Sequence, residues 1–159
     1  MLIELPDFIL RAVVAAALGL LIGYDRERKS KPLGMRAYML VSLGSAGLMM
    51  VTMNFTIDAV DAGLSSGIDA TRAVQGMIGG LGFIGGGAVI SNSSDGRLRG
   101  VASGAAIWGV GGIGMACGMG YVLEAVVLAG LSFLILFVCD WLQTDGALPD
   151  GEHDDGDDK

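Results

Sequence analysis

The sequence predicts an all-α, polytopic membrane bundle with five transmembrane helices, the N-terminus outside and the C-terminus in the cytoplasm. Three observations lead to this prediction. Hydrophobic residues make up 52% and charged residues 17% of the 159 positions, with a mean hydropathy of +0.61. Glycine occurs 27 times, well above the ~7% of an average protein. Charge-poor apolar runs long enough to cross a bilayer core of about 30 Å recur along the chain, and lipid forces such runs to be helical because their backbone groups must be satisfied internally.

The first two predicted spans flank a basic loop. Residues 8–24 form an apolar run with a single charge, Arg11, near its outer end. Residues 1–7 carry no Lys or Arg, which is unlike a cleaved secretory signal, so we treat this run as a retained span. The loop 25–36 is the most basic part of the chain and contains Pro and Gly, which turn it. Residues 37–57 are free of charge and predict the second span.

The glycine-rich stretch 73–91 predicts the third span. Glycine on a membrane helix lets a neighbouring backbone approach closely when it recurs every fourth residue. We therefore expect this helix to be the central one, held by its neighbours. The sequence leaves open whether its glycine face meets another subunit, and whether the span crosses fully or is partly re-entrant. The glycines with this expected packing role are Gly19, Gly23, Gly76, Gly80, Gly82, Gly86, Gly100 and Gly104.

The last two spans come from one long apolar segment. Residues 101–139 carry only one charge, Glu124. As a single helix this segment would be about 58 Å long, roughly twice the bilayer core. It must therefore fold back, and the glycine-containing stretch 118–121 predicts the hairpin, with spans at 101–118 and 122–140.

The distribution of basic residues orients the chain. The loops 25–36 and 92–100 hold most of the Lys and Arg, and basic loops stay in the cytoplasm. Residues 1–144 then form one multi-pass membrane domain. Residues 145–159 are acidic and nearly devoid of apolar side chains, so we expect a disordered cytoplasmic tail.

A charged group at the basic loop has two interpretations. Asp25, Arg26 and Glu27 directly follow the first span, with Arg28 and Lys29 next to them, and Arg36 precedes the second span. The first interpretation is that these charges only anchor the topology of the chain. Alternatively they form a buried acid–base cluster in which Asp25 or Glu27 pairs with Arg36, holding the first two helices in register or gating a path.

A second charged group precedes the third span and also has two interpretations. Asp69 can be the N-cap of that helix, with Arg72 reaching the membrane interface. Alternatively Arg72 lies inside the bundle near Arg11, with Asp69 as its counter-ion. The second interpretation expects Asp69→Asn or Arg72→Ala to abolish activity while insertion stays normal.

Few residues suit catalysis or metal binding. The only histidine is His153 in the tail, and Cys117 and Cys139 are expected at opposite membrane faces, where they cannot form a disulfide. We therefore predict no metal site, no cofactor and no catalytic residues. The stretch 80–85 matches a Gly-x-Gly-x-x-Gly dinucleotide fingerprint, but that motif needs a preceding strand, so helix packing is the favoured interpretation. Nothing in the sequence suggests a nucleic-acid partner.

Several blocks, in order, resemble the MgtC/SapB family of bacterial inner-membrane proteins. The first is Gly19–Glu27, GLLIGYDRE, in which Asp25 stands where the family has Glu. The second is Gly34–Ala37, GMRA. The third is the Asp69–Arg72 helix start followed by Gly80–Gly87, GLGFIGGG. The fourth is Gly100–Trp108, GVASGAAIW, with fewer hydroxyls than the family pattern. The resemblance covers about residues 8–140.

The resemblance implies a non-enzymatic protein of the bacterial inner membrane that is linked to growth under magnesium limitation and, in pathogens, to survival inside host cells. It also implies a regulatory role through another membrane complex, such as ATP synthase. The glycine faces themselves predict a homodimer. The alternative is a small transporter or channel subunit for magnesium or another cation, which would need polar groups inside the bundle. The nearest candidates for those groups are Ser42, Ser45, Gln75 and Ser103.

Overall fold

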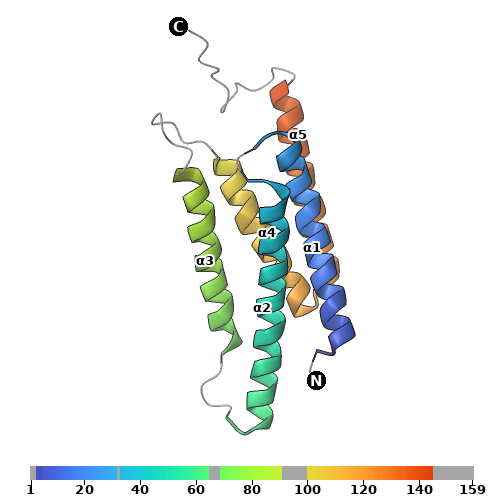
Figure 1. Cartoon of the computed structure of the whole chain (residues 1–159), viewed down its shortest axis with the longest axis vertical. Coiled ribbons are helices and arrows are strands. Elements are labelled where there is room, and N and C mark those ends of the chain that lie inside the picture. Colours follow the sequence, from blue (N-terminus) through green and yellow to red (C-terminus); the bar gives the residue numbers. More distant parts are fainter. Residues whose placement is uncertain (1–2, 32, 65–68, 91–99, 145–159) are drawn as a thin grey trace.

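The computed structural model describes residues 3–31, 33–64, 69–90 and 100–144, and within these it contains five helices and no strand. The helices form one elongated bundle with their axes roughly along its length (Figure 1). The predicted tail and almost all of the 92–100 loop lie outside the described residues. The helices are α1 (Leu5–Arg28), α2 (Met35–Asp61), α3 (Ala70–Ile90), α4 (Val101–Met119) and α5 (Val122–Thr144).

The predicted all-α membrane fold is confirmed. Four of the five helices, α1, α2, α4 and α5, are long and apolar enough to cross a membrane. Each helix begins at or before its predicted span, and all but α3 run past its predicted end. A full crossing by α3 and the orientation of the termini remain predictions. For clarity, the basic end of the bundle is the end where α1 and α5 finish, and the far end is where the α4–α5 turn lies.

The prediction that the glycine-rich third helix is central is wrong, because α4 takes that place. α4 contacts all four other helices, whereas α3 packs mainly on α4 and only slightly on α2. Figure 1 shows α3 at one edge of the bundle. The physical reason is the side on which the glycines lie. Most of the glycines of α4 face its neighbours, whereas most of those of α3 do not.

The glycines of α4 let two helices cross it closely. A Cβ on Gly104 would lie 2.6 Å from the carbonyl oxygen of Gly85 in α3, and a Cβ on Gly118 would lie 2.6 Å from the carbonyl oxygen of Ala46 in α2. Real Cβ atoms essentially never come this close. Glycine at these positions therefore sets how near α3 and α2 approach α4.

The predicted glycine contacts on α1 and α3 have different outcomes. A Cβ on Gly19 would lie 2.7 Å from the carbonyl oxygen of Tyr38, and one on Gly23 would lie 2.7 Å from Cα of Met35, so α1 packs tightly on α2 as expected. On α3 the expected contacts are absent within the described chain. Nothing lies within 4 Å of a Cβ added at any of the four glycines predicted to pack there, Gly76, Gly80, Gly82 and Gly86.

Two connections to α4 depend on glycine for their backbone conformation. Gly120 closes the α4–α5 turn with φ = +93°, and Gly100 precedes α4 with φ = +80°. Side chains other than glycine rarely tolerate this left-handed region. The hairpin predicted at 118–121 is confirmed.

Candidate functional site

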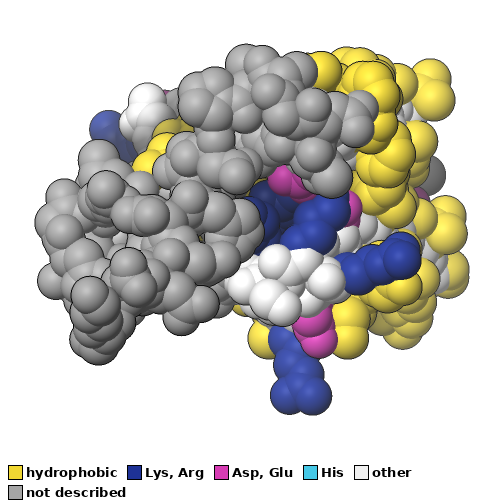
Figure 2. All heavy atoms as spheres, turned by 90° about the horizontal axis from the view of Figure 1, so that it is seen from above, with side chains coloured by type: hydrophobic (Ala, Val, Ile, Leu, Met, Phe, Trp, Pro, Cys, Tyr) yellow, Lys and Arg dark blue, Asp and Glu magenta, His cyan; other side chains and the backbone are white. Residues whose placement is uncertain are grey.

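An ion-pair cluster joins the ends of α1 and α5 at the basic end of the bundle. It consists of Asp25, Arg26, Lys29 and Asp140. The Arg26 guanidinium donates to Asp25 at 2.9 Å and to Asp140 at 3.0 Å. The Lys29 ammonium lies 2.6 Å from Asp25 and 2.5 Å from Asp140. Figure 2, which views the bundle from this end, shows basic and acidic side chains gathered beside the apolar surface.

Charge balance allows this cluster to be buried. The Arg26 side chain is only 2% exposed, and a buried charge is costly unless it is paired and hydrogen-bonded. Two cations and two carboxylates make the cluster neutral. Burial alone would lower the pKa of Lys29, but its hydrogen bonds to Asp140 and Asp25 outweigh burial and raise it. Lys29 therefore stays protonated at physiological pH, and the cluster stays intact.

Asp140 is the member of this cluster that the sequence analysis missed. It lies near the end of α5. The other acidic residue of α5, Glu124, lies in the first turn of the helix. A signal was present, because an acidic residue at the end of an apolar span is expensive without a partner. Its position next to the basic loop under the predicted topology also pointed to a cationic partner.

The predicted pairing of Asp25 or Glu27 with Arg36 is wrong. Asp25 is held by Arg26 and Lys29. Glu27 accepts a hydrogen bond from the backbone N–H of Met35 at 2.7 Å, at the start of α2, where helix N–H groups have no partner of their own. Arg36 is exposed. The negative charge of Glu27 thus stabilises the N-terminus of α2, and among the described residues it forms no ion pair.

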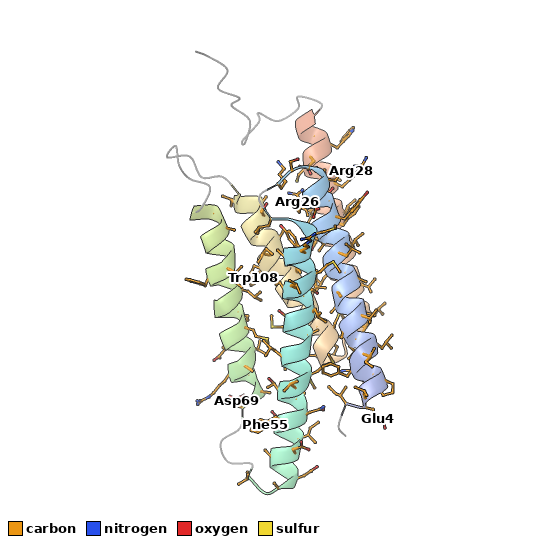
Figure 3. All side chains as sticks on the ribbon, viewed as in Figure 1. Glu4, Arg26, Arg28, Phe55, Asp69 and Trp108 are labelled. Atoms are coloured by element: carbon orange, nitrogen blue, oxygen red, sulfur yellow. The ribbon has the colours of Figure 1, made fainter. Side chains whose placement is uncertain are left out.

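A further buried contact ties α2 to α4 below the cluster. The Tyr38 hydroxyl is fully buried and donates to the backbone carbonyl of Ser103 at 3.3 Å. At the basic end, α1 is therefore linked to α5 by ion pairs and to α2 by Glu27, and α2 is linked to α4 by Tyr38. Arg26 and Arg28 mark this end in Figure 3. Four helices are joined within a short distance of one membrane face.

The charged residues at the far end do not form one site. Arg11 lies 2.5 Å from Asp7 and donates to the Gly118 carbonyl at 3.1 Å, which fixes α1 to the α4–α5 turn. Asp69 accepts from the backbone N–H of Thr71 at 2.9 Å and from its hydroxyl, so it caps α3. Arg72 is exposed. The interpretation that places Arg72 in the bundle near Arg11 is therefore wrong, and the N-cap interpretation holds.

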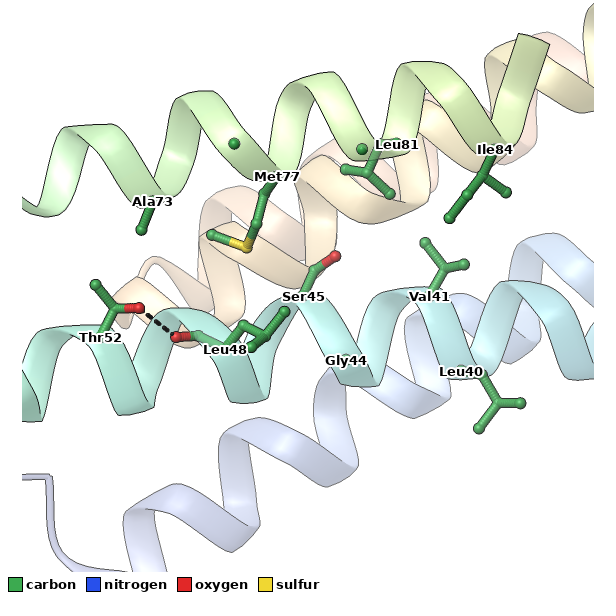
Figure 4. Close-up of a pocket in the computed structure, with 12 residues that line it drawn as sticks. Leu40, Val41, Gly44, Ser45, Leu48, Thr52, Ala73, Met77, Leu81 and Ile84 are labelled. Atoms are coloured by element: carbon green, nitrogen blue, oxygen red, sulfur yellow. Dashed lines mark hydrogen bonds between the residues drawn. The ribbon is translucent and has the colours of Figure 1, made fainter. Parts of the chain in front are cut away.

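A groove of about 640 Å³ separates α2 from α3. Its walls are almost entirely apolar, with Leu48 and Val41 facing Met77 and Leu81 across it (Figure 4). Glycine occurs on both walls. Of the open glycines of α3, Gly76 and Gly80 line this groove, whereas Gly82 and Gly86 do not.

The polar groups proposed for an ion path are partly buried in the bundle. Ser42, Ser45 and Ser103 are buried, whereas Gln75 is exposed. Among the described residues, the Ser42 hydroxyl is the buried side-chain group without a hydrogen-bond partner. Within that same part of the chain, no three His, Cys, Asp or Glu side chains gather to hold a metal ion. Cys117 and Cys139 are free, the first buried and the second exposed.

Known proteins resemble this chain over most of its length. The family model described as "MgtC family" matches residues 12–144. SapB of Bacillus subtilis is 34% identical over 133 residues, which is 84% of this chain and 56% of SapB. MgtC of Salmonella typhimurium is 30% identical over 132 residues, covering 83% of this chain and 50% of MgtC.

A further relative carries a functional name. YhiD of Escherichia coli K12, whose name assigns it provisionally as a magnesium transporter, is 30% identical over 132 residues, 83% of this chain and 60% of YhiD. The chain thus spans between half and two thirds of the length of these relatives. No solved structure matches it.

Proposed function

The chain belongs to the MgtC family, and we propose that it is a non-enzymatic regulator in the bacterial inner membrane. It is a multi-pass membrane protein. We infer that it acts by docking the open side of α3 against a helix of another membrane protein under magnesium limitation. The basic end faces the cytoplasm in this proposal, as the positive-inside rule predicts.

The observation that carries the proposal is the open glycine face. Gly82 and Gly86 lie one turn apart on α3, and a Cβ on either would meet nothing within 4 Å. Phe83, between them in sequence, is 84% exposed. In lipid, close glycine approach is a main source of helix–helix affinity. The same α3 already shows such a contact elsewhere, where Gly85 meets Gly104.

A specific partner follows from the family resemblance, which implies restraint of ATP synthase. The experiment is the cellular ATP level during magnesium starvation, compared between a deletion strain and its parent. Loss of the protein should raise ATP, and the unaltered chain should restore the parental level. Gly82→Leu should fail to restore it. Gly130→Leu is the matched control, because Gly130 is an exposed glycine on α5 that also has nothing within 4 Å.

Two results would count against this proposal. If the ATP level is unchanged in the deletion strain, the protein does not restrain ATP synthase. If Gly82→Leu and Gly130→Leu restore the ATP level equally, at equal membrane abundance, the open face of α3 is not the docking surface. A dimer formed through the same glycines is the simplest competing occupant, and a native mass of one subunit in both detergent and lipid would exclude it.

A cation transporter is the second candidate. The buried serines Ser42, Ser45 and Ser103 favour it, as does the name of YhiD. Against it, the described charges lie at the ends of the bundle and the interior of the bundle offers only hydroxyls. Magnesium uptake into liposomes containing the purified protein, compared with empty liposomes, tests it directly.

A further inference from the structure

We propose that a groove between the ends of α1 and α5 binds the head group of an anionic phospholipid. This head-group groove has a volume of about 460 Å³ and lies beside the ion-pair cluster at the basic end. It is separate from the α2–α3 groove, and the proposal does not depend on the regulatory function above. The residues of the groove that the argument uses are Tyr24, Arg28, Lys29, Phe133, Phe137 and Trp141.

The groove offers hydrogen-bond donors in excess of acceptors. Asp25 and Asp140 also line it, but their carboxylates are engaged by Arg26 and Lys29. Lys29 uses two of its three ammonium donors on these carboxylates. Arg28 is exposed and forms no ion pair within the described part of the chain. The cluster is neutral, so Arg28 gives the groove one net positive charge, which matches the single negative charge of a phosphodiester.

Aromatic rings form the wall that leads from the groove toward the membrane interior. Phe133 and Phe137 stack with ring centroids 6.4 Å apart and nearly parallel planes. Trp141 follows one turn later at the end of the α5 span, and Tyr24 faces the groove from α1. Tryptophan and tyrosine favour the depth of lipid head groups. The indole N–H of Trp141 adds a further donor at that depth.

The shape of the site favours a lipid over a dissolved anion. Tyr24, Phe137 and Trp141 are 57%, 55% and 58% exposed, so a small phosphate bound at Arg28 would leave their apolar faces uncovered. A phospholipid places its phosphate at the basic residues and its glycerol and first methylenes against the rings. It also arrives laterally, along the exposed apolar surface of α5.

The experiment measures which lipid lies beside Trp141. The chain has two tryptophans, so Trp108→Phe leaves Trp141 as the only strong emitter. The protein is reconstituted in vesicles of equal parts phosphatidylglycerol and phosphatidylcholine, with bromine on the acyl chains of one lipid at a time. The quenching of Trp141 should correspond to a binding constant for phosphatidylglycerol about fivefold higher than that for phosphatidylcholine. A factor of this size is the contribution expected of one basic residue at a membrane surface.

Three substitutions separate a specific site from general surface charge. We define the lipid preference as the ratio of the binding constants for phosphatidylglycerol and phosphatidylcholine. Arg28→Gln should bring this ratio close to one, and Arg28→Lys should retain most of the preference. Arg36→Gln is the matched control, because Arg36 is an exposed arginine at the same end that does not line the groove. It should leave the preference unchanged.

Three results would overturn the proposal. Equal quenching by both brominated lipids means that the groove does not select a charge. Equal loss in Arg28→Gln and Arg36→Gln means that the preference comes from diffuse surface charge. Abolition of the preference by excess inorganic phosphate, at constant ionic strength, means that the groove binds a dissolved anion.

Discussion

Replacing Gly85 by Ala should weaken the attachment of α3 to the rest of the bundle. An added Cβ would lie 2.8 Å from the carbonyl oxygen of Gly104, whereas ordinary van der Waals contact begins at 3.4 Å. The two helices would therefore have to separate by about 0.6 Å, the difference between these distances. Overpacking of this kind costs about 1–3 kcal/mol.

The next residue provides the control. Gly86→Ala adds the same methyl group to the same helix, but nothing lies within 4 Å of it. Any gain in helix propensity, at most about 1 kcal/mol, is common to both variants and cancels in the comparison. The free energy of unfolding should thus be about 1–3 kcal/mol lower for Gly85→Ala than for Gly86→Ala.

The assay is unfolding by titration of SDS into detergent micelles, followed by tryptophan fluorescence. Trp108 lies on α4 (Figure 3), so its emission reports on the helix that α3 leaves. Equal stability of the two variants would refute the Gly85–Gly104 crossing. It would also contradict the assignment of Gly86 to an open face, because the Gly85 contact and the open Gly86 position depend on the same rotation of α3 about its axis.

Three further predictions test other contacts. Asp140→Asn should lower the free energy of unfolding by about 1–3 kcal/mol, because Arg26 loses a charged partner in a partly exposed cluster, whereas Glu124→Gln, on the same helix, should have little effect in the same titration. The hydrogen bonds from Thr71 lower the pKa of Asp69, so the cap is present above the ordinary pKa of an aspartate and is lost as the pH falls through the lowered value. The protection of the Thr71 amide, measured as its exchange rate relative to the intrinsic rate at each pH, should fall only at that acidic pH. Ser42→Ala should maintain or raise stability, because it removes an unpaired buried hydroxyl, and a loss of magnesium uptake in this variant would favour the transporter.

Hydropathy predicted the course of the chain because the membrane limits it so strongly. The hairpin at Gly120 followed from length and from glycine, since residues 101–139 as one helix would be roughly twice as long as the bilayer core and residues 118–121 contain the glycines that allow a turn. The N-cap role of Asp69 followed from its place before an apolar run. These features depend only on local sequence and on the thickness of the bilayer.

Lateral arrangement could not be predicted in the same way. Glycine permits close approach but does not say which neighbour approaches. The Gly76 and Gly82 faces of α3 looked as suited to packing as the glycine face of α4. Only the face of α4 is in contact with neighbouring helices, through Ala46 at Gly118 and Gly85 at Gly104. Likewise, Arg26 and Asp140 are 114 positions apart, and no local pattern links them.

The distribution of close contacts suggests how the bundle divides its tasks. Around α4, glycine contacts and the Tyr38–Ser103 hydrogen bond fix α2, and the ion-pair cluster fixes α5 to α1. α3 has the Gly85–Gly104 crossing and the contact of Leu81 with Gly111, and a groove separates it from α2. Because it has fewer restraints, α3 is the helix that a partner can move at the lowest cost in free energy. A partner that binds its open face would therefore change the width of the α2–α3 groove before it disturbed the cluster at the basic end.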